Sequence, residues 1–183
     1  DFLSSNIKLI NKYSWPITKI KIFNQRNNSN EFIDFSNENK KNFFLIKYND
    51  LFSLLEKACK KSKKISFKLY TNKELEDLEI RNKHNIIINS DNKNILTKKY
   101  FNKVIKKDYN SSAFTGIIHH SKIKNSTAVQ IFTKYGPLAF LPLSKTKTSI
   151  VYSVEKKYHL ELKEIKKLIL KFNKIYKIKT LDE

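Results

Sequence analysis

The histidines and the one cysteine are the side chains of this chain that could ligate a metal or serve as base and nucleophile. His119 and His120 are adjacent, and neighbouring side chains of a strand point to opposite faces, so the pair cannot chelate one ion. His84, His159 and the lone Cys59 stand at no spacing that would complete a metal site or a disulfide. No grouping of Ser, His and acid is recognisable from spacing. The sequence therefore predicts no metal centre and gives no support for nucleophilic catalysis.

Scarce glycine limits how the chain could hold a nucleotide. Gly116 and Gly136 are its only two glycines, so it contains neither a GxGxxG turn nor a P-loop, both of which need glycine where backbone cradles phosphate. If the protein binds a dinucleotide, we expect its principal phosphate-binding element to lie outside this chain.

The stretch Thr127–Leu143 holds one of the two glycines and two of the three prolines. It reads TAVQIFTKYGPLAFLPL, which predicts a strand with Gln130 and Phe132 on one face, a break at Tyr135-Gly136-Pro137, and a second apolar strand. A tight turn lets backbone approach a ligand, so Gly136 and Pro137 are predicted to lie next to a site. For Leu138, Leu141 and Leu143, a place in the core is favoured over a place in a cavity wall.

The first half of the chain alternates short strands with helices. The Asn49–Lys61 segment has an apolar stripe at helical spacing, with Asn49 as a plausible N-cap. Its flanking strands, Phe43–Tyr48 and Ile65–Tyr70, would make a crossover unit with parallel strands. The other expected elements are a helix in Phe2–Tyr13, a hairpin of Ile17–Ile22 with Glu31–Phe35, a buried strand at Ile86–Ile88 and a polar helix at Asn94–Lys103.

The second half is predicted to be a sheet followed by a helix. Four consecutive strand candidates joined by short polar turns indicate an antiparallel meander: Ala113–His119, Thr127–Thr133, Leu138–Leu143 and Ser149–Val154. A helix at Leu160–Phe172 and a last strand at Tyr176–Leu181 follow. The predicted fold class is α+β, a largely antiparallel sheet with flanking helices.

The chain is strongly basic, with 37 Lys and Arg against 17 Asp and Glu and a formal net charge of +20. Clustered basic residues can neutralise nucleic-acid phosphates. Arg26 and Arg81 are the only arginines, however, and the lysines are spread along the whole chain, whereas nucleic-acid readers rely on Arg for bidentate and stacking contacts. An AT-rich genome, whose codons favour Lys, Asn, Ile, Phe and Tyr, explains this composition more simply. No specific nucleic-acid partner is predicted.

Cysteine usage and hydropathy indicate the compartment. A single Cys59 fits a reducing, cytoplasmic setting, and the apolar runs are too short to span a bilayer. The chain begins at Asp1 and not at Met, so we expect it to be a piece of a longer protein.

Thr127–Leu143, together with the SIVYS sequence of Ser149–Ser153, resembles the UbiH-type ubiquinone-biosynthesis hydroxylases. These belong to the flavin-dependent aromatic hydroxylases similar to p-hydroxybenzoate hydroxylase. That family typically reads TAxQRFTxxGPLAxLPL and then SxVWS. Ile131 stands where the family usually has Arg, and Tyr152 where it usually has Trp.

Weaker landmarks follow in the same order as in the family. Ser90–Ile95 lies where the family has an Asp-Gly-x-x-Ser motif that helps to hold FAD, with Asn92 replacing the glycine and Ile95 the serine. The resemblance implies cofactor contacts at Asp91 and Asn92. Because asparagine tolerates left-handed backbone angles, Asn92 is expected to preserve the turn.

The resemblance implies that the chain is the central part of an FAD-dependent monooxygenase that hydroxylates a polyprenyl phenol in ubiquinone biosynthesis, with NAD(P)H as electron donor. On its own the chain is expected to be inactive. Its parts would be 1–48, a helix and the first substrate-domain strands; 49–107, a partial α/β flavin-domain segment; and 108–183, the main substrate-domain sheet and C-terminal helix. The implied substrate-cavity residues are Gln130, Phe132, Gly136, Pro137, Leu138 and Phe140.

The implied partners are a lipid-like phenolic substrate and other ubiquinone-biosynthesis proteins, with peripheral association with the inner membrane. The alternative is a non-catalytic module, either a remnant of the hydroxylase or a basic nucleic-acid-binding domain. The missing glycine at Asn92 and the absent nucleotide loop favour the remnant over an active enzyme for this chain taken alone.

Overall fold

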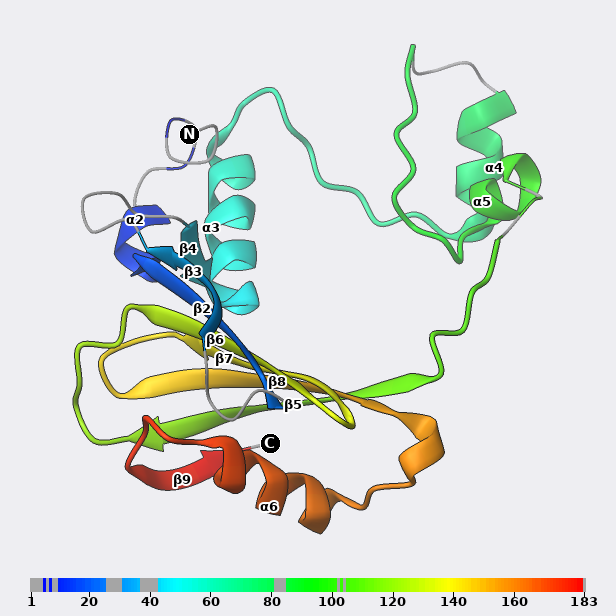
Figure 1. Ribbon diagram of the computed structural model, residues 1–183. Helices are drawn as coiled ribbons and strands as arrows, with labels where there is room; N and C mark the ends of the chain where they lie inside the picture. The colour runs from blue at the N-terminus through cyan, green and yellow to red at the C-terminus, as the bar shows by residue number, and fades with distance from the viewer. Residues whose placement is uncertain are drawn as a thin grey trace. The chain divides into compact units, whose positions relative to one another are not determined.

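The computed structural model describes residues 5, 7, 10–25, 31–36, 43–80, 85–101, 103 and 105–182. The chain divides into two compact units, one formed by residues 1–59 and 109–183 and the other by the inserted residues 60–108 (Figure 1). The described residues contain both helices and a mixed sheet, so the fold class is α+β, as predicted. The sequence analysis predicted three parts, 1–48, 49–107 and 108–183, and their boundaries lie near those of the two units.

A seven-stranded sheet forms the first unit, in the order β3-β2-β6-β7-β8-β5-β9. Every neighbouring pair is antiparallel except β2 and β6, which run parallel. The strands are β2 (Lys19–Asn24), β3 (Glu31–Ser36), β5 (Ser111–His120), β6 (Thr127–Thr133), β7 (Gly136–Pro142), β8 (Lys147–Glu155) and β9 (Ile178–Asp182). The predicted β2-β3 hairpin and the four central strands are confirmed.

The meander prediction holds only for β6, β7 and β8. Strand β5 pairs with β8, as in Thr115 opposite Val151, and not with β6. The edge of β6 that β5 was expected to occupy is taken by β2, whose approach is anchored by a hydrogen bond of 2.9 Å from the Thr18 amide to the Ser126 carbonyl. Pairing across such a long sequence separation carries no local sequence signal.

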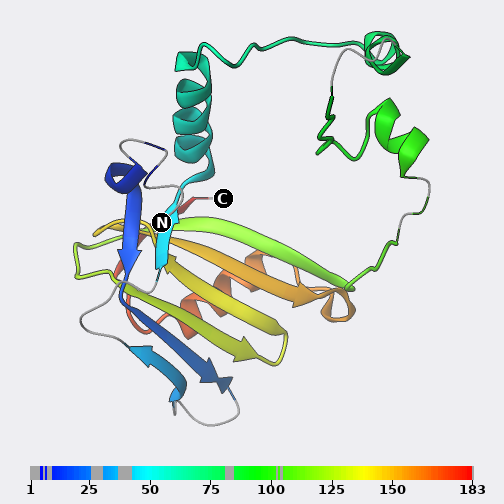
Figure 2. The same ribbon diagram turned by 90° about the horizontal axis from the view of Figure 1, so that it is seen from above.

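Helix α6 (Leu162–Phe172) packs against one face of this sheet (Figures 1 and 2). It begins where the Glu161 amide donates to the Glu164 carboxylate at 2.9 Å, which satisfies an otherwise unpaired donor of the first turn. Ile169 is fully buried, and Ile165, Leu168 and Phe172 pack around it. The buried core on this face consists of Ile118, Val129, Leu138, Phe140, Ile150, Tyr152, Val154, Ile169 and Tyr176.

A two-stranded ribbon also belongs to this unit. Strands β1 (Ser14–Ile17) and β4 (Phe43–Ile46) pair antiparallel, preceded by the short helix α2 (Ile10–Tyr13). The helix predicted in Phe2–Tyr13 is thus helical in its last turn, and the earlier part falls largely outside the described residues. Helix α3 (Tyr48–Lys61) confirms the predicted helix, although it begins at Tyr48, one residue before the expected cap Asn49.

The predicted parallel crossover is wrong. Ile65–Tyr70 forms no strand, and its apolar side chains are exposed, with Leu69 fully accessible. The strand that precedes α3 pairs antiparallel with β1. The alternation in Ile65–Tyr70 has a strand-like period, but a strand needs a partner, and the described part of this unit offers none.

The inserted unit, residues 60–108, contains helices α4 (Asn72–Ile80) and α5 (Ile95–Tyr100), and the described residues 85–94 between them form neither helix nor strand. The strand expected at Ile86–Ile88 is also wrong, since this run has no strand structure and Ile88 is 91% exposed. Helix α5 confirms the centre of the helix expected at Asn94–Lys103. Across the described residues of the chain, no helix combines the length and the apolar character needed to cross a membrane.

Candidate site on the open face of the sheet

The predicted substrate-cavity residues lie on two opposite faces of the sheet. In the β6-β7 register, Phe132 is opposite Pro137 and Gln130 is opposite Ala139, on the face away from α6. Leu138 and Phe140 project to the α6 face, where they are 0% and 2% exposed. The six residues therefore cannot line one cavity, which corrects the prediction, and Leu138 is a core residue.

We refer to the face of β5–β8 that points away from α6 as the open face. Along β8 the residues alternate strictly between buried positions on the α6 face and half-buried positions on the open face. One row across the open face consists of Gln130, Ala139, Val151 and Thr115 on β6, β7, β8 and β5. Phe132, 45% exposed, stands two residues beyond Gln130.

The chemistry available to this row is binding and not proton transfer. None of its four side chains is ionisable: it offers small apolar surface, one amide and one hydroxyl. Small side chains on a pleated sheet make a flat wall, and the amide and hydroxyl can hydrogen-bond a polar substituent. The row could hold a planar, mostly apolar molecule, whose reactive partner would have to come from elsewhere.

The turn between β6 and β7 is tightly fixed by its own backbone. Gly136 has φ of 137°, and a Cβ placed there would lie 2.2 Å from the Ser153 carbonyl oxygen of β8. The Glu155 amide donates to the Tyr135 carbonyl at 3.0 Å, and the Thr133 hydroxyl donates to the Gly136 carbonyl at 2.7 Å. Glycine is thus required by the approach of β7 to β8, and its presence needs no bound ligand.

Beneath this turn, the Thr133 hydroxyl also lies 2.9 Å from the Tyr152 hydroxyl on the α6 face. Tyr152 is buried, and burial raises the pKa of its phenol. The residue that stands where the hydroxylase family usually has Trp therefore serves as a core side chain whose polar tip supports the turn.

Asp91 and Asn92, predicted to contact FAD, belong to a closed hydrogen-bonded turn in the inserted unit. The Asp91 carboxylate accepts from the Lys93 amide at 2.9 Å, and its own amide donates to Asn89 Oδ1 at 3.2 Å. The Thr97 hydroxyl donates to the Asp91 carbonyl, while Asn94 Oδ1 accepts from the Thr97 amide and caps α5.

Asn92 does not adopt the left-handed conformation expected of it. Among described residues other than glycine, positive φ occurs at Asn110 and His159. The turn is held by hydrogen bonds of the Asn89 and Asp91 side chains to backbone amides. The turn expected at Asn92 is present, without a positive φ, and the contact of Asp91 and Asn92 with FAD stays a prediction.

The two adjacent histidines point to different environments, as predicted. His119 Nε2 lies 2.7 Å from the Asp182 carboxylate near the sheet edge, whereas His120 is 2% exposed and its Nε2 lies 3.0 Å from the Thr148 hydroxyl. Within the described ranges, no three His, Cys, Asp or Glu side chains gather closely enough to hold a metal ion.

Sequence reasoning missed a buried polar network around Asn125. Its Nδ2 donates to the Ser144 carbonyl at 2.7 Å and to the Thr148 hydroxyl at 2.9 Å, and its Oδ1 accepts from the Tyr176 hydroxyl at 3.1 Å. The indole of Trp15 donates to the Asn125 carbonyl. These partners lie far apart in sequence. One signal in the sequence could have indicated a buried polar group here. His120 lies two residues after Ile118 in β5, so the two side chains point to the same buried face, and His120 Nε2 lies 3.4 Å from Asn125 Nδ2.

The comparisons with known proteins assign no family. No protein-family model matches the chain, and a search of curated proteins finds no significant match.

Proposed function

We propose that this chain is the substrate-facing part of an FAD-dependent aromatic hydroxylase of the UbiH type, acting on a polyprenyl phenol. The proposal rests on how the residues of the Thr127–Leu143 motif are divided between the two faces of the sheet. Gln130, Phe132 and Pro137 share the open face, while Leu138 and Phe140 of the same motif fill the core behind it. The phenol ring would lie against the row from Gln130 to Thr115.

On this proposal the chain positions the ring and supplies no cofactor contact. The open-face row carries no acid or base, and flavin chemistry is a property of the cofactor that the surrounding protein orients and shields from water. The Asp91 carboxylate is already bonded to the Lys93 amide, and the chain has too few glycines for a dinucleotide fingerprint. FAD and NAD(P)H would be held by segments outside this chain.

The decisive experiment uses the parent protein that contains this chain together with its flanking sequence. We expect the purified parent to be yellow, with flavin absorbance, and to oxidise NAD(P)H faster when a polyprenyl phenol is added. A correctly folded, colourless parent that does not take up added FAD would overturn the proposal. For residues 1–183 alone we expect no FAD uptake, so stoichiometric uptake would contradict the assignment of cofactor contacts to flanking segments.

A pair of variants in the parent tests the open face itself. Phe132→Ala should raise the KM for the phenol, because Phe132 borders the ring-binding row. Leu170→Ala removes a side chain of comparable exposure, 55% against 45%, from α6 on the other side of the sheet, and should leave KM unchanged. Equal effects of the two substitutions would count against a substrate site on the open face.

The alternative functions predict different outcomes for the same parent protein. A non-catalytic remnant would fold but bind no flavin. A basic nucleic-acid-binding module would in addition shift with single-stranded RNA or DNA, with an affinity that falls steeply as salt is raised.

A further inference from the structure

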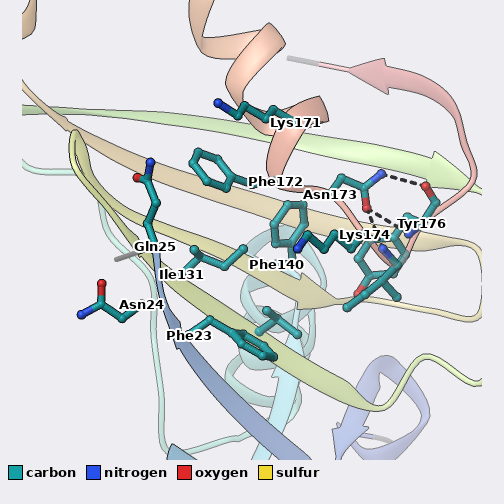
Figure 3. A pocket seen from close by; sticks show the side chains of 12 residues that line it. Phe23, Asn24, Gln25, Ile131, Phe140, Lys171, Phe172, Asn173, Lys174 and Tyr176 are labelled. Atoms are coloured by element: carbon teal, nitrogen blue, oxygen red, sulfur yellow. Dashed lines mark hydrogen bonds between the residues drawn. The ribbon is translucent and has the colours of Figure 1, made fainter. Parts of the chain in front are cut away.

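A cavity of about 320 Å³ lies on the α6 face, between the C-terminal end of α6 and strands β2, β6 and β7 (Figure 3). This volume falls at the lower end of the range of about 300–1,000 Å³ that is usual for small-molecule pockets. Of the residues predicted from sequence to form a cavity, Phe140 is the one that lines this space. The body of a molecule that binds here must be small and apolar, because the walls are mainly aromatic and aliphatic: Phe23, Val129, Ile131, Phe140, Phe172 and Ile175.

The charged side chains around this cavity do not select an ion. Lys171 and Lys174 line it, and Figure 3 shows their side chains pointing apart, so they do not converge on one anionic group. Among the described residues that line the cavity there is no Asp or Glu. A cation would therefore face two lysines without gaining a counter-charge. The cavity is suited to an uncharged molecule.

The rim next to α6 is held in place by its own hydrogen bonds. Asn173 Nδ2 donates to the Tyr176 carbonyl at 2.7 Å, and its Oδ1 accepts from the Tyr176 amide at 2.9 Å. The Tyr176 hydroxyl donates to Asn125 Oδ1 at 3.1 Å. These polar groups are engaged within the chain, and a rim fixed before binding lowers the entropy lost when a ligand is bound.

Gln25, which follows β2 on the opposite side of the cavity, has a hydrogen-bond donor to offer. Its Oε1 accepts from the Lys134 amide at 2.8 Å. A backbone amide can only donate, so this contact identifies the oxygen of the Gln25 amide group and leaves Nε2 at its other corner. Figure 3 shows the Gln25 side chain extending from the end of β2 toward α6. Within the described part of the chain, Nε2 donates no hydrogen bond.

The polar group of the ligand follows from this donor. A carbonyl oxygen accepts a hydrogen bond and brings no proton that would need an acceptor of its own. A hydroxyl group would bring such a proton, and an apolar wall offers it no acceptor. An apolar cavity with one amide N–H at its edge is therefore complementary to an uncharged carbonyl compound.

We propose that this cavity binds a small cyclic ketone, with its apolar rings between Ile131, Phe140 and Phe172 and its oxygen accepting a hydrogen bond from Gln25 Nε2. The site is separate from the open face, because Phe140 and α6 lie on the other side of the sheet from Gln130. It therefore does not depend on the proposed hydroxylase function.

The test is a calorimetric titration of the 183-residue chain with tetralone, a bicyclic ketone. Tetralin, the same ring system without the carbonyl group, is the second probe. We expect saturable one-to-one binding of tetralone. Absence of saturable tetralone binding would overturn the proposal.

A pair of matched variants tests the hydrogen bond. Gln25→Glu keeps an acceptor for the Lys134 amide but replaces the donor with a carboxylate oxygen. It should weaken tetralone binding by about three- to tenfold, which corresponds to the net contribution of one hydrogen bond, and leave tetralin binding unchanged.

The control Gln130→Glu makes the same substitution on the open face and should leave the affinity for both probes unchanged. An equal loss of tetralone binding in the control would place the ketone on the open face or show that binding follows net charge. An equal loss of tetralin binding in Gln25→Glu would show that the amide does not contact the carbonyl. Either result would overturn the proposal.

A cavity-filling substitution tests where the rings lie. Ile131→Trp should abolish binding of both probes while the thermal unfolding transition is retained. If that variant unfolds, the smaller Ile131→Phe replaces it, with an expected loss of several-fold in affinity for both probes. Unchanged binding in a folded Ile131 variant would place the ligand elsewhere and overturn the proposal.

Discussion

The two faces of the seven-stranded sheet are built from the same strands but from different chemistry. On the α6 face, Ile150 and Tyr152 of β8 are fully buried, whereas their neighbours Ser149, Val151 and Ser153 on the open face are half-buried. The difference follows from alternation, since successive side chains of a strand point to opposite faces. One hairpin, β6-β7, therefore supplies both the core and the proposed ring-binding wall.

The faces also differ in how they use polar groups. On the α6 face, Asn125, Thr148 and Tyr176 bond to one another in the interior, which avoids the cost of an unpaired buried polar group. On the open face, Gln130 and Thr115 are set among small apolar neighbours and are accessible in part. The polar atoms of the α6 face contribute to stability, whereas those of the open face are accessible and would contact the ligand on the proposed function.

The largest expected effect comes from Gly136, because the register of β6, β7 and β8 decides which residues belong to which face. Gly136→Ala would place a Cβ against the Ser153 carbonyl and demand a φ that alanine avoids. We expect a loss of about 4 kcal/mol or more in the free energy of unfolding. Urea unfolding followed by the fluorescence of Trp15, the only tryptophan, measures it.

Gly116→Ala is a milder substitution, whose loss of stability can be compared with that of Gly136→Ala in the same experiment. Its added Cβ would lie 2.9 Å from the Asp182 carbonyl of β9, a strand at the edge of the sheet with one neighbouring strand. We expect a smaller loss, about 1–2 kcal/mol. A larger loss than at Gly136 would contradict the role assigned to the β6-β7 turn.

A pair of truncations separates the faces directly. Leu138→Ala removes a fully buried side chain on the α6 face and should cost about 3 kcal/mol. Phe132→Ala removes a side chain that is 45% exposed on the open face and should cost less than about 1 kcal/mol. The same urea experiment reads both, and similar losses at the two positions would mean that the open face is covered.

The smallest effect is a pH dependence that belongs to the α6 face. Burial raises the pKa of Tyr176 above its ordinary value of 10.0, so the folded chain keeps a proton that the unfolded chain releases. The free energy of unfolding should therefore be unaffected by this group below about pH 10 and fall as pH rises above it. Urea midpoints at a series of alkaline pH values measure the slope.

Tyr176→Phe is the control for that slope. It should cost about 1–2 kcal/mol at neutral pH, because the hydroxyl no longer donates to Asn125 Oδ1. The alkaline fall should also become shallower, and the part that remains would come from Tyr152 and Lys157, whose pKa values are raised by burial and by the hydrogen bond to Glu155, respectively. An unchanged slope would mean that Tyr176 titrates alike in the folded and unfolded chain.

Sequence reasoning succeeded where structure is local. The alternation in β5 to β8 and the helical spacing in α3 and α6 depend on residues a few positions apart, and these elements were predicted within a few residues. Ile65–Tyr70 and Ile86–Ile88 had the right composition for strands but no partner strand among the described residues of their unit. The partners of β5 and β2 could not be read from local pattern at all.

Only part of the candidate site could be predicted from the sequence, for a related reason. Alternation alone separates Pro137 from Leu138, but which residues of β6 share a face with Pro137 depends on the length of the turn between them. The turn pairs Phe132 with Pro137, and only this register unites Gln130, Phe132 and Pro137. The cavity beside α6 brings together Phe23, Ile131 and Phe172, which lie far apart in sequence.

The parallel contact between β2 and β6 has a consequence for synthesis on the ribosome. Thr18 bonds to Ser126 although the two residues are 108 positions apart, and the whole inserted unit is translated between them. During synthesis, the edge of β2 that pairs with β6 therefore has no partner strand until β6 has left the ribosome. Such delayed closure slows folding and leaves a strand edge open to aggregation, so the nascent chain is a candidate client for a chaperone during that interval.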